Sequence, residues 1–203
     1  FLRAEVPQAI ASAQDGVSRI SQIVGAMKEF SHPGTKEKVA TDLNRAILST
    51  ITVARGEWKH HADVITQLDP ELPAVACRAD EFNQVILNLI VNAAHAIRDA
   101  RAQRGPGKGT ITVVTRAVPT GVEIRVTDTG VGIPEEIRAR VYDPFFTTKA
   151  VGKGTGQGLA IAHDVIVVKH GGTIDFESQT GVGTTFVVTL PLGTAEPALE
   201  NAA

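Results

Sequence analysis

A row of amide side chains lies along one side of an otherwise apolar segment, Asn83 to Ile97. At 100° per residue, a helix places the polar residues of this region within an arc of roughly 80°: Gln84, Asn88, Asn92, His95 and Asp99. Such a helix is buried on most sides, so its amide stripe must face something polar other than bulk water. Two Asn carbonyl oxygens one turn apart suit a hard cation such as magnesium bound to phosphate. The alternative is a helix whose amides bond to the neighbouring backbone.

A second candidate site follows a predicted strand, in the sequence Asp128-Thr129-Gly130-Val131-Gly132. Glycine lets the backbone approach a ligand closely. A buried carboxylate beside it can accept a hydrogen bond from an exocyclic amine such as that of adenine. The alternative is a simple turn with a capping Asp.

A third candidate is the run DPFFTTK from Asp143 to Lys149, followed by GKGTGQG from Gly152 to Gly158. Small residues at this density predict a mobile loop that the Phe pair can pin down and a ligand can order. The loop leads into a helix at Leu159, whose N-terminal amides can receive phosphate oxygens. It is not a Walker loop, because both GK pairs of the chain are followed by glycine rather than by Ser or Thr.

These candidate residues need secondary-structure elements to position them. A seam of apolar residues predicts a long amphipathic helix in residues 1–30, which needs a partner surface to stay folded. Hydrophobic periodicity and turn signals then predict helices and strands in this order: helix 42–55, strands 62–68 and 75–77, helix 79–104, strands 110–118 and 122–129, a short helix from 134, helix 159–170, and a closing hairpin of strands 173–178 and 184–191.

The order of these elements is mixed rather than strictly alternating, and its hairpins require antiparallel pairs. It predicts an α+β fold, a two-layer sandwich with helices on one face of a mixed, mostly antiparallel sheet, preceded by the long N-terminal helix. A doubly wound nucleotide fold is not expected.

Composition limits the class of protein. With 203 residues, 43% of them hydrophobic, the chain can form one sizeable domain plus an appendage. A formal net charge of −2 does not favour nucleic acid or an acidic membrane as a partner. The single cysteine, Cys77, excludes an intramolecular disulfide and fits a reducing compartment. No apolar run approaches the roughly 18 residues needed to span a bilayer, so we expect a cytoplasmic, soluble portion of a longer protein, whether or not that parent is membrane-anchored.

In order and spacing, the motifs resemble the ATP-binding catalytic domain of sensor histidine kinases, within the GHKL superfamily of chaperone, gyrase and mismatch-repair ATPases. The matching stretches are NQVILNLIVNAAHAI, DTGVGIP, DPFFTTK, GTGQGLAIAHDV, GGTIDFES and GVGTTFVVTLP. The resemblance covers about Thr41 to Leu192, and several motifs in order are more specific than any one of them. The first segment of the chain also resembles the second helix of the dimerisation and phosphotransfer domain.

The resemblance implies a role for each matching residue. Asn92 is the expected magnesium ligand, Asn88 supports the metal and the phosphates, and Asp128 reads the adenine amino group. Around the base, the glycines after Asp128 let the adenine ring lie close, and Thr184 completes the adenine pocket through a water. In the lid, the Phe pair anchors the loop and the glycines let it fold over the triphosphate. The lid lysines contact phosphate unless they are merely solvated. The expected further ATP contacts are His95, Gly130, Gly132, Phe145, Phe146, Lys149, Lys153, Gly154, Thr155, Gly156, Gln157, Gly158, Leu159 and Thr184.

One position that discriminates among the relatives, and two departures from the pattern of the kinases, bear on the reaction. Hydrolysing relatives carry a Glu one turn before the metal Asn, but this chain has Asn88 there, and an amide cannot take a proton. The resemblance therefore implies transfer of the γ-phosphoryl group to a histidine rather than to water. His95 stands where many of these kinases have a phosphate-contacting Lys, which predicts a weaker or pH-dependent contact. His163 mimics the acceptor pattern but lies after the lid, so the acceptor is expected upstream of Phe1.

The resemblance divides the chain into a partial dimerisation helix at 1–31, a linker at 32–40, the catalytic domain at 41–193 and a tail at 194–203. It implies ATP and Mg²⁺ as cofactors, a homodimer formed through the N-terminal helix, and a response regulator receiver domain as partner, with no nucleic acid and no direct membrane contact. The competing hypotheses are a non-hydrolysing ATP-sensing or anti-sigma-type interaction module of the same fold, and a true ATPase.

Overall fold

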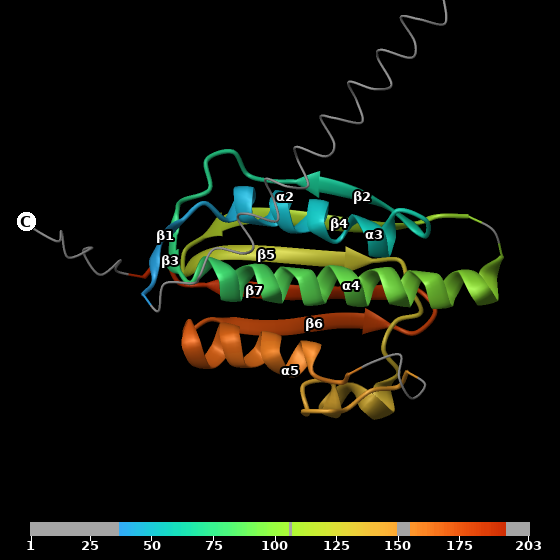
Figure 1. Ribbon diagram of the computed structural model, residues 1–203. Helices are drawn as coiled ribbons and strands as arrows, with labels where there is room; N and C mark the ends of the chain where they lie inside the picture. The colour runs from blue at the N-terminus through green and yellow to red at the C-terminus, as the bar shows by residue number, and fades with distance from the viewer. Residues whose placement is uncertain (1–36, 106, 150–154, 194–203) are drawn as a thin grey trace, which may run out of the picture.

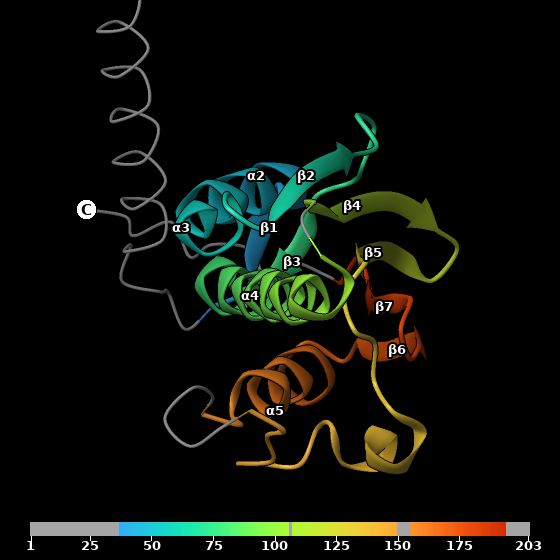
Figure 2. The ribbon, with the colours of Figure 1, turned by 90° about the vertical axis from the view of Figure 1, so that its right-hand side faces the viewer.

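A computed structural model describes residues 37–105, 107–149 and 155–193 of the chain. The predicted N-terminal helix, most of the predicted linker and the tail lie outside the described residues, so the division into domains stays a prediction. The described part is a sheet with helices on one of its faces (Figures 1 and 2). This arrangement confirms the predicted two-layer α+β fold.

The main sheet has five strands in the order β2-β4-β5-β7-β6. The β2–β4 pair is parallel and every other pair in this sheet is antiparallel. A small second sheet pairs β1 with β3 antiparallel. The strands are β1 (Val39–Thr41), β2 (Ala62–Gln67), β3 (Val75–Cys77), β4 (Gly109–Val118), β5 (Gly121–Asp128), β6 (Thr173–Gln179) and β7 (Gly183–Leu190).

The helices cover a single face of this sheet (Figure 2). The long helix α4 lies across the middle strands, flanked by α2 and α3 on one side and by α5 on the other (Figure 1). Two short helical turns complete the set, the 3-10 turn η1 and the π turn η2. The bounds are α2 (Leu43–Val53), α3 (Arg55–Trp58), α4 (Ala79–Arg104), η1 (Glu135–Arg140), α5 (Gly158–His163) and η2 (Asp164–Lys169).

The core lies between the helix layer and the inner face of the sheet. Strand β5 alternates as a half-covered strand must, with Val122, Ile124 and Val126 buried and the residues between them only partly covered. Helix α4 contributes the largest set of buried side chains, which explains why its sequence is apolar on most sides: Phe82, Val85, Ile86, Leu89, Ile90, Ala93, Ala94 and Ile97.

Three local features differ from the sequence prediction. Val39 and Ala40 were expected in the polar linker, but they belong to β1 and pair with β3. The helix predicted from Pro134 is a 3-10 turn rather than an α-helix. The predicted helix 159–170 changes to π geometry after His163. His170 closes this π turn, because its ring Nδ1 lies 2.7 Å from the Val165 carbonyl oxygen.

Burial of α4 predicts which leucines stabilise the fold. We expect Leu89→Ala to lower the free energy of unfolding by about 2–5 kcal/mol, because Leu89 is 1% exposed and its loss leaves a cavity. Leu48→Ala on α2 is the matched control. That side chain is 48% exposed, so the loss should stay below about 1 kcal/mol. Urea denaturation measures both values, and equal losses would contradict the assignment of α4 to the core.

Candidate functional site

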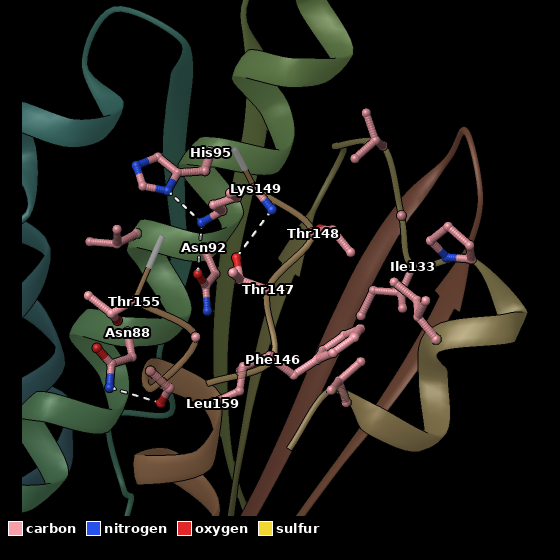
Figure 3. Close-up of a pocket in the computed structure, with 18 of the residues that line it drawn as sticks. Asn88, Asn92, His95, Ile133, Phe146, Thr147, Thr148, Lys149, Thr155 and Leu159 are labelled. Carbon is pink, nitrogen blue, oxygen red and sulfur yellow. Dashed lines mark hydrogen bonds between the residues drawn. The ribbon is translucent and has the colours of Figure 1, made fainter. Parts of the chain in front are cut away.

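A cavity of about 880 Å³ lies between α4, the turn η1 and the lid, by which we mean the described residues 143–149 and 155–157. Figure 3 shows Asn88, Asn92 and His95 in a row along α4, with lid residues facing them. The opposite wall is apolar and includes Ile133, Ile137, Val141 and Phe146. A cavity of this size, polar at one side and apolar at the other, suits a ligand of nucleotide size.

Asn88, Asn92 and His95 of the predicted polar stripe line this cavity, whereas Gln84 and Asp99 are exposed and lie outside its lining. Asn88 uses its Nδ2 as a donor to the Gly158 carbonyl oxygen at 3.0 Å, so it ties α4 to the first residue of α5. Because the side-chain nitrogen makes that bond, the side-chain oxygen Oδ1 of Asn88 is not used by it and can act as an acceptor. Asn92 accepts through its Oδ1 from the Lys149 ammonium at 3.4 Å. The alternative prediction, in which the amides bond to the neighbouring backbone, describes Asn88 but not Asn92, whose partner is a side chain.

His95 and Lys149 meet at the same end of the cavity. The Lys149 Nζ lies 2.8 Å from His95 Nδ1 (Figure 3). On its other side, His95 Nε2 lies 3.5 Å from the Glu57 carboxylate on α3. Burial lowers the pKa of His95, and the positive charge of Lys149 lowers it further. Burial also lowers the pKa of Lys149. A neutral His95 can therefore accept a hydrogen bond from the ammonium.

Asp128 is a buried carboxyl at the end of β5, only 6% exposed. It accepts the Gly130 N–H at 2.7 Å through Oδ1. Burial raises its pKa to about 6, against the opposing effect of hydrogen bonds from the Gly130 and Thr184 backbone. Among the described residues, Asp128, Gly130 and Thr184 lie behind the cavity wall rather than on it, since the lining at this end comes from Val131, Gly132, Thr180 and Gly181.

At two of the predicted glycines, neighbouring atoms leave no room for a side chain. Gly130 packs on α4, where a Cβ would lie 2.5 Å from the Ala96 Cβ. Gly132 has φ +73 and faces the Gln179 carbonyl oxygen, so a side chain there would be both strained and blocked. These glycines let the loop after β5 pass between α4 and the β6–β7 turn.

The two Phe residues of the lid have different roles. Phe146 lines the cavity, and the Arg140 guanidinium lies 4.5 Å from its ring centroid. The Phe145 ring is 70% exposed, so the prediction that both rings pin the lid is wrong for Phe145. Its backbone does the fastening instead, because the Phe145 N–H donates to the Gly156 oxygen at 2.8 Å. Gly156 has φ +65 and packs directly on that backbone.

Thr155, Gly158 and Leu159 line the cavity, which is where their predicted ATP contacts would have to be, whereas Gln157 is exposed and does not line it. Lys153 and Gly154 lie outside the described residues. Sequence reasoning missed part of the lining, although some of it lay inside the quoted motifs DTGVGIP and DPFFTTK. The lining residues not predicted are Leu87, Val91, Val131, Ile133, Pro134, Ile137, Val141, Thr147, Thr148, Thr180 and Gly181.

A mixed sheet with helices on one face and an amide-lined cavity beneath a glycine-rich lid define a nucleotide-binding α+β domain. The family profile described as "Histidine kinase-, DNA gyrase B-, and HSP90-like ATPase" matches residues 77–194. The chain belongs to this family, which confirms the predicted resemblance and supports ATP as the ligand. None of the helices in the described ranges combines the length and the apolar character needed to cross a bilayer.

Similar proteins come from curated sequences and from solved structures. The sensor histidine kinase ZraS of Escherichia coli (strain K12) is 35% identical over 175 residues, which are 86% of this chain and 35% of ZraS. The histidine kinase/phosphatase NtrB of Azospirillum brasilense is 34% identical over 185 residues, which are 88% of this chain and 45% of NtrB. The chain thus spans less than half the length of these relatives.

Among solved structures, the nucleotide-free catalytic domain of histidine kinase ThkA aligns with a TM-score of 0.64 at 30% identity. The alignment covers 77% of this chain and 98% of that domain. The mycobacterial sensor histidine kinase MprB aligns with a TM-score of 0.62 at 26% identity, over 76% of this chain and 97% of the MprB chain. These domains share the fold of the described residues almost from end to end.

The raised pKa of Asp128 predicts a specific pH dependence of stability. Burial moves this pKa from 3.8 to about 6 in the folded state, so the folded chain binds the proton more tightly than the unfolded chain does. The resulting stabilisation is complete below about pH 4 and is lost as the pH rises through 6. Asp128→Asn cannot ionise, so between pH 4 and 8 it should gain about 2–3 kcal/mol relative to wild type.

Urea denaturation of wild type and Asp128→Asn at a series of pH values measures this difference. Asp175→Asn removes an exposed carboxyl from β6 of the same sheet and controls for the loss of one charge. Parallel stability profiles for wild type and Asp128→Asn would show that Asp128 does not titrate as its burial requires.

Proposed function

We propose that this chain binds MgATP and acts as the catalytic domain of a two-component sensor histidine kinase. It transfers the γ-phosphoryl group to a histidine on a dimerisation helix, for relay to the receiver domain of a response regulator. The observation that carries this proposal is the convergence of Asn88, Asn92, His95 and Lys149 at one end of a cavity that is otherwise largely apolar. The names of the relatives, which are sensor histidine kinases, support the same reaction class.

The residues at this end fit a divalent cation. The Asn92 Oδ1 accepts a hydrogen bond from the Lys149 ammonium at 3.4 Å, which supports Asn92 as a partner for positively charged groups at this end. An amide oxygen is also a ligand that Mg²⁺ prefers. Bound Mg²⁺ would neutralise charge on the phosphates. We assign Asn92 as the metal ligand and Asn88 as its supporting neighbour.

The opposite end of the site suits the nucleobase. Val131, Ile133 and Phe146 supply apolar surface for a flat ring, and Asp128 with Thr184 lies behind it as a buried pair of polar groups. Because Asp128 already accepts the Gly130 N–H through Oδ1, its second oxygen is the acceptor we assign to the adenine amino group.

Phosphoryl transfer, rather than hydrolysis, follows from the amide at position 88. Activating a water molecule requires a group that accepts its proton, and Asn88 cannot do so. His163, which mimics the acceptor pattern, and the nearby His170 both have structural contacts. His163 packs on the Tyr142 ring at 5.2 Å between centroids. His170 uses both ring nitrogens, on the Val165 oxygen and on the Arg78 N–H. We therefore place the acceptor histidine, and the homodimer contact, on helix sequence preceding the catalytic domain in a cytoplasmic portion of the parent protein.

Two substitutions separate the ends of the nucleotide site. We expect Asn92→Ala to weaken MgATP binding about 10- to 100-fold, since it removes a ligand of a charged group, and to leave adenosine binding unchanged. Asp128→Ala should abolish binding of both adenosine and MgATP, with a thermal midpoint within a few degrees of wild type. Isothermal titration calorimetry measures these affinities. Unchanged adenosine affinity in Asp128→Ala would remove the adenine assignment.

The reaction class has its own test. Incubated with γ-labelled MgATP, the 203-residue chain should show no efficient self-labelling and no steady release of phosphate, because we assign none of its six histidines as the acceptor. Addition of a separate acceptor-helix peptide should yield labelled peptide. Steady phosphate release that Asn88→Ala abolishes would instead identify a true ATPase, and efficient self-labelling of the chain alone would contradict the placement of the acceptor.

A further inference from the structure

Four polar side chains form a continuous chain from α3, across α4, to the lid. The Glu57 carboxylate lies 3.5 Å from His95 Nε2. His95 Nδ1 lies 2.8 Å from Lys149 Nζ, and the same ammonium lies 3.4 Å from Asn92 Oδ1 (Figure 3). The sequence separates Glu57, His95 and Lys149 widely, so only the fold brings them together. Glu57 itself does not line the cavity and matches no motif of the nucleotide site.

The chemistry of the partners fixes the direction of these contacts. An ammonium group can only donate, so the His95 Nδ1 beside Lys149 must be the acceptor. The imidazole proton then sits on Nε2, which is the nitrogen that faces Glu57. Burial and the charge of Lys149 both lower the pKa of His95, which agrees with a neutral ring, while Glu57 opposes this shift. The other charged neighbours are Arg98, which also lowers this pKa, and Asp99, which faces Lys149.

Helix α3, which carries Glu57, is held in place by hydrogen bonds to α2 and, just after the helix, to α4. The neighbouring Trp58 donates its indole N–H to the Ile51 oxygen at 3.1 Å, which anchors α3 to α2. Arg101 of α4 donates to the His60 carbonyl oxygen at 2.6 Å, which anchors the residues just after α3 to α4. The carboxylate is therefore presented to His95 by a fixed support, although its side chain is 54% exposed.

We propose that Glu57 is a positioning residue of the nucleotide site, which acts through His95 to hold Lys149 of the lid at the phosphate end of the cavity. The inference rests on the proposed function and deepens it. Glu57 keeps the proton of His95 on Nε2, and the free Nδ1 then holds the ammonium beside Asn92. In this chain the cationic side chain at the phosphate end comes from the lid, and the α4 histidine holds it there.

The sign of the effect makes the proposal testable. A carboxylate near a triphosphate repels it, so removal of Glu57 should tighten MgATP binding if only through-space charge mattered. We expect the opposite. Glu57→Ala should weaken MgATP binding about three- to fivefold, the effect of one lost hydrogen bond. Glu57→Gln should stay within about twofold of wild type, because its amide oxygen still accepts from Nε2–H. Both variants remove the same charge, so their difference isolates the hydrogen bond.

Three further measurements separate positioning from a general structural effect. Adenosine affinity should not change in Glu57→Ala, since adenosine carries no phosphate. In a Lys149→Met background, Glu57→Ala should cause no further loss of MgATP affinity, because the residue it positions is absent. Glu71→Ala, which removes an exposed carboxylate from the loop between β2 and β3, should match wild type.

Equal or tighter MgATP binding by Glu57→Ala would overturn the proposal, as would an equal loss in the Lys149→Met background or a matching loss of adenosine affinity. In each of these cases wild-type binding of adenosine and MgATP would persist, and the proposed function would stand. A wild-type chain that bound neither molecule would overturn the proposed function and this inference together.

Discussion

The packing of α4 against the sheet is the interaction on which the rest of the structure depends. Its apolar side chains share one hydrophobic cluster with buried residues of β4, β5 and β7, and Leu89 and Ile90 are almost completely enclosed. Because the helix cannot rotate without exposing that surface, Asn88, Asn92 and His95 on its polar side are held facing the cavity. The same packing brings α4 so close to the loop after β5 that residue 130 must lack a side chain. Core and site are therefore two sides of one helix.

The charges of the site come from different layers of the molecule. Helix α4 supplies neutral amides and a neutral imidazole, the lid supplies the ammonium of Lys149, and β5 supplies a carboxyl buried beneath the wall. Because the ammonium comes from the lid, the contact between Lys149 and His95 joins the lid to the phosphate end of the site.

Most of the fold and the centre of the site could be predicted from the sequence. The 3.6-residue period of α4 and the alternation in β5 reflect burial directly, and the predicted bounds of α4 agree with those observed. Strand β1 could not be predicted, since three residues carry no usable period and their partner strand is distant in sequence. Neither could the exposed ring of Phe145 or the contact of Glu57 with His95, because side-chain contacts between distant segments leave no trace in local spacing.

Asp128 shows how this domain divides free energy between folding and binding. Two backbone N–H groups, rather than a cationic side chain, hold the carboxyl in the interior, and that is not enough to keep its pKa at the ordinary value. At neutral pH the Asp128 carboxyl is therefore mostly ionised, and its negative charge is buried with too few hydrogen-bond partners. An amino group brought in by a ligand would complete its hydrogen bonding. Ligand binding would therefore relieve a free-energy cost that the folded domain carries when the carboxylate lacks this partner. A sequence change that increases this contribution to affinity would lower the stability of the fold.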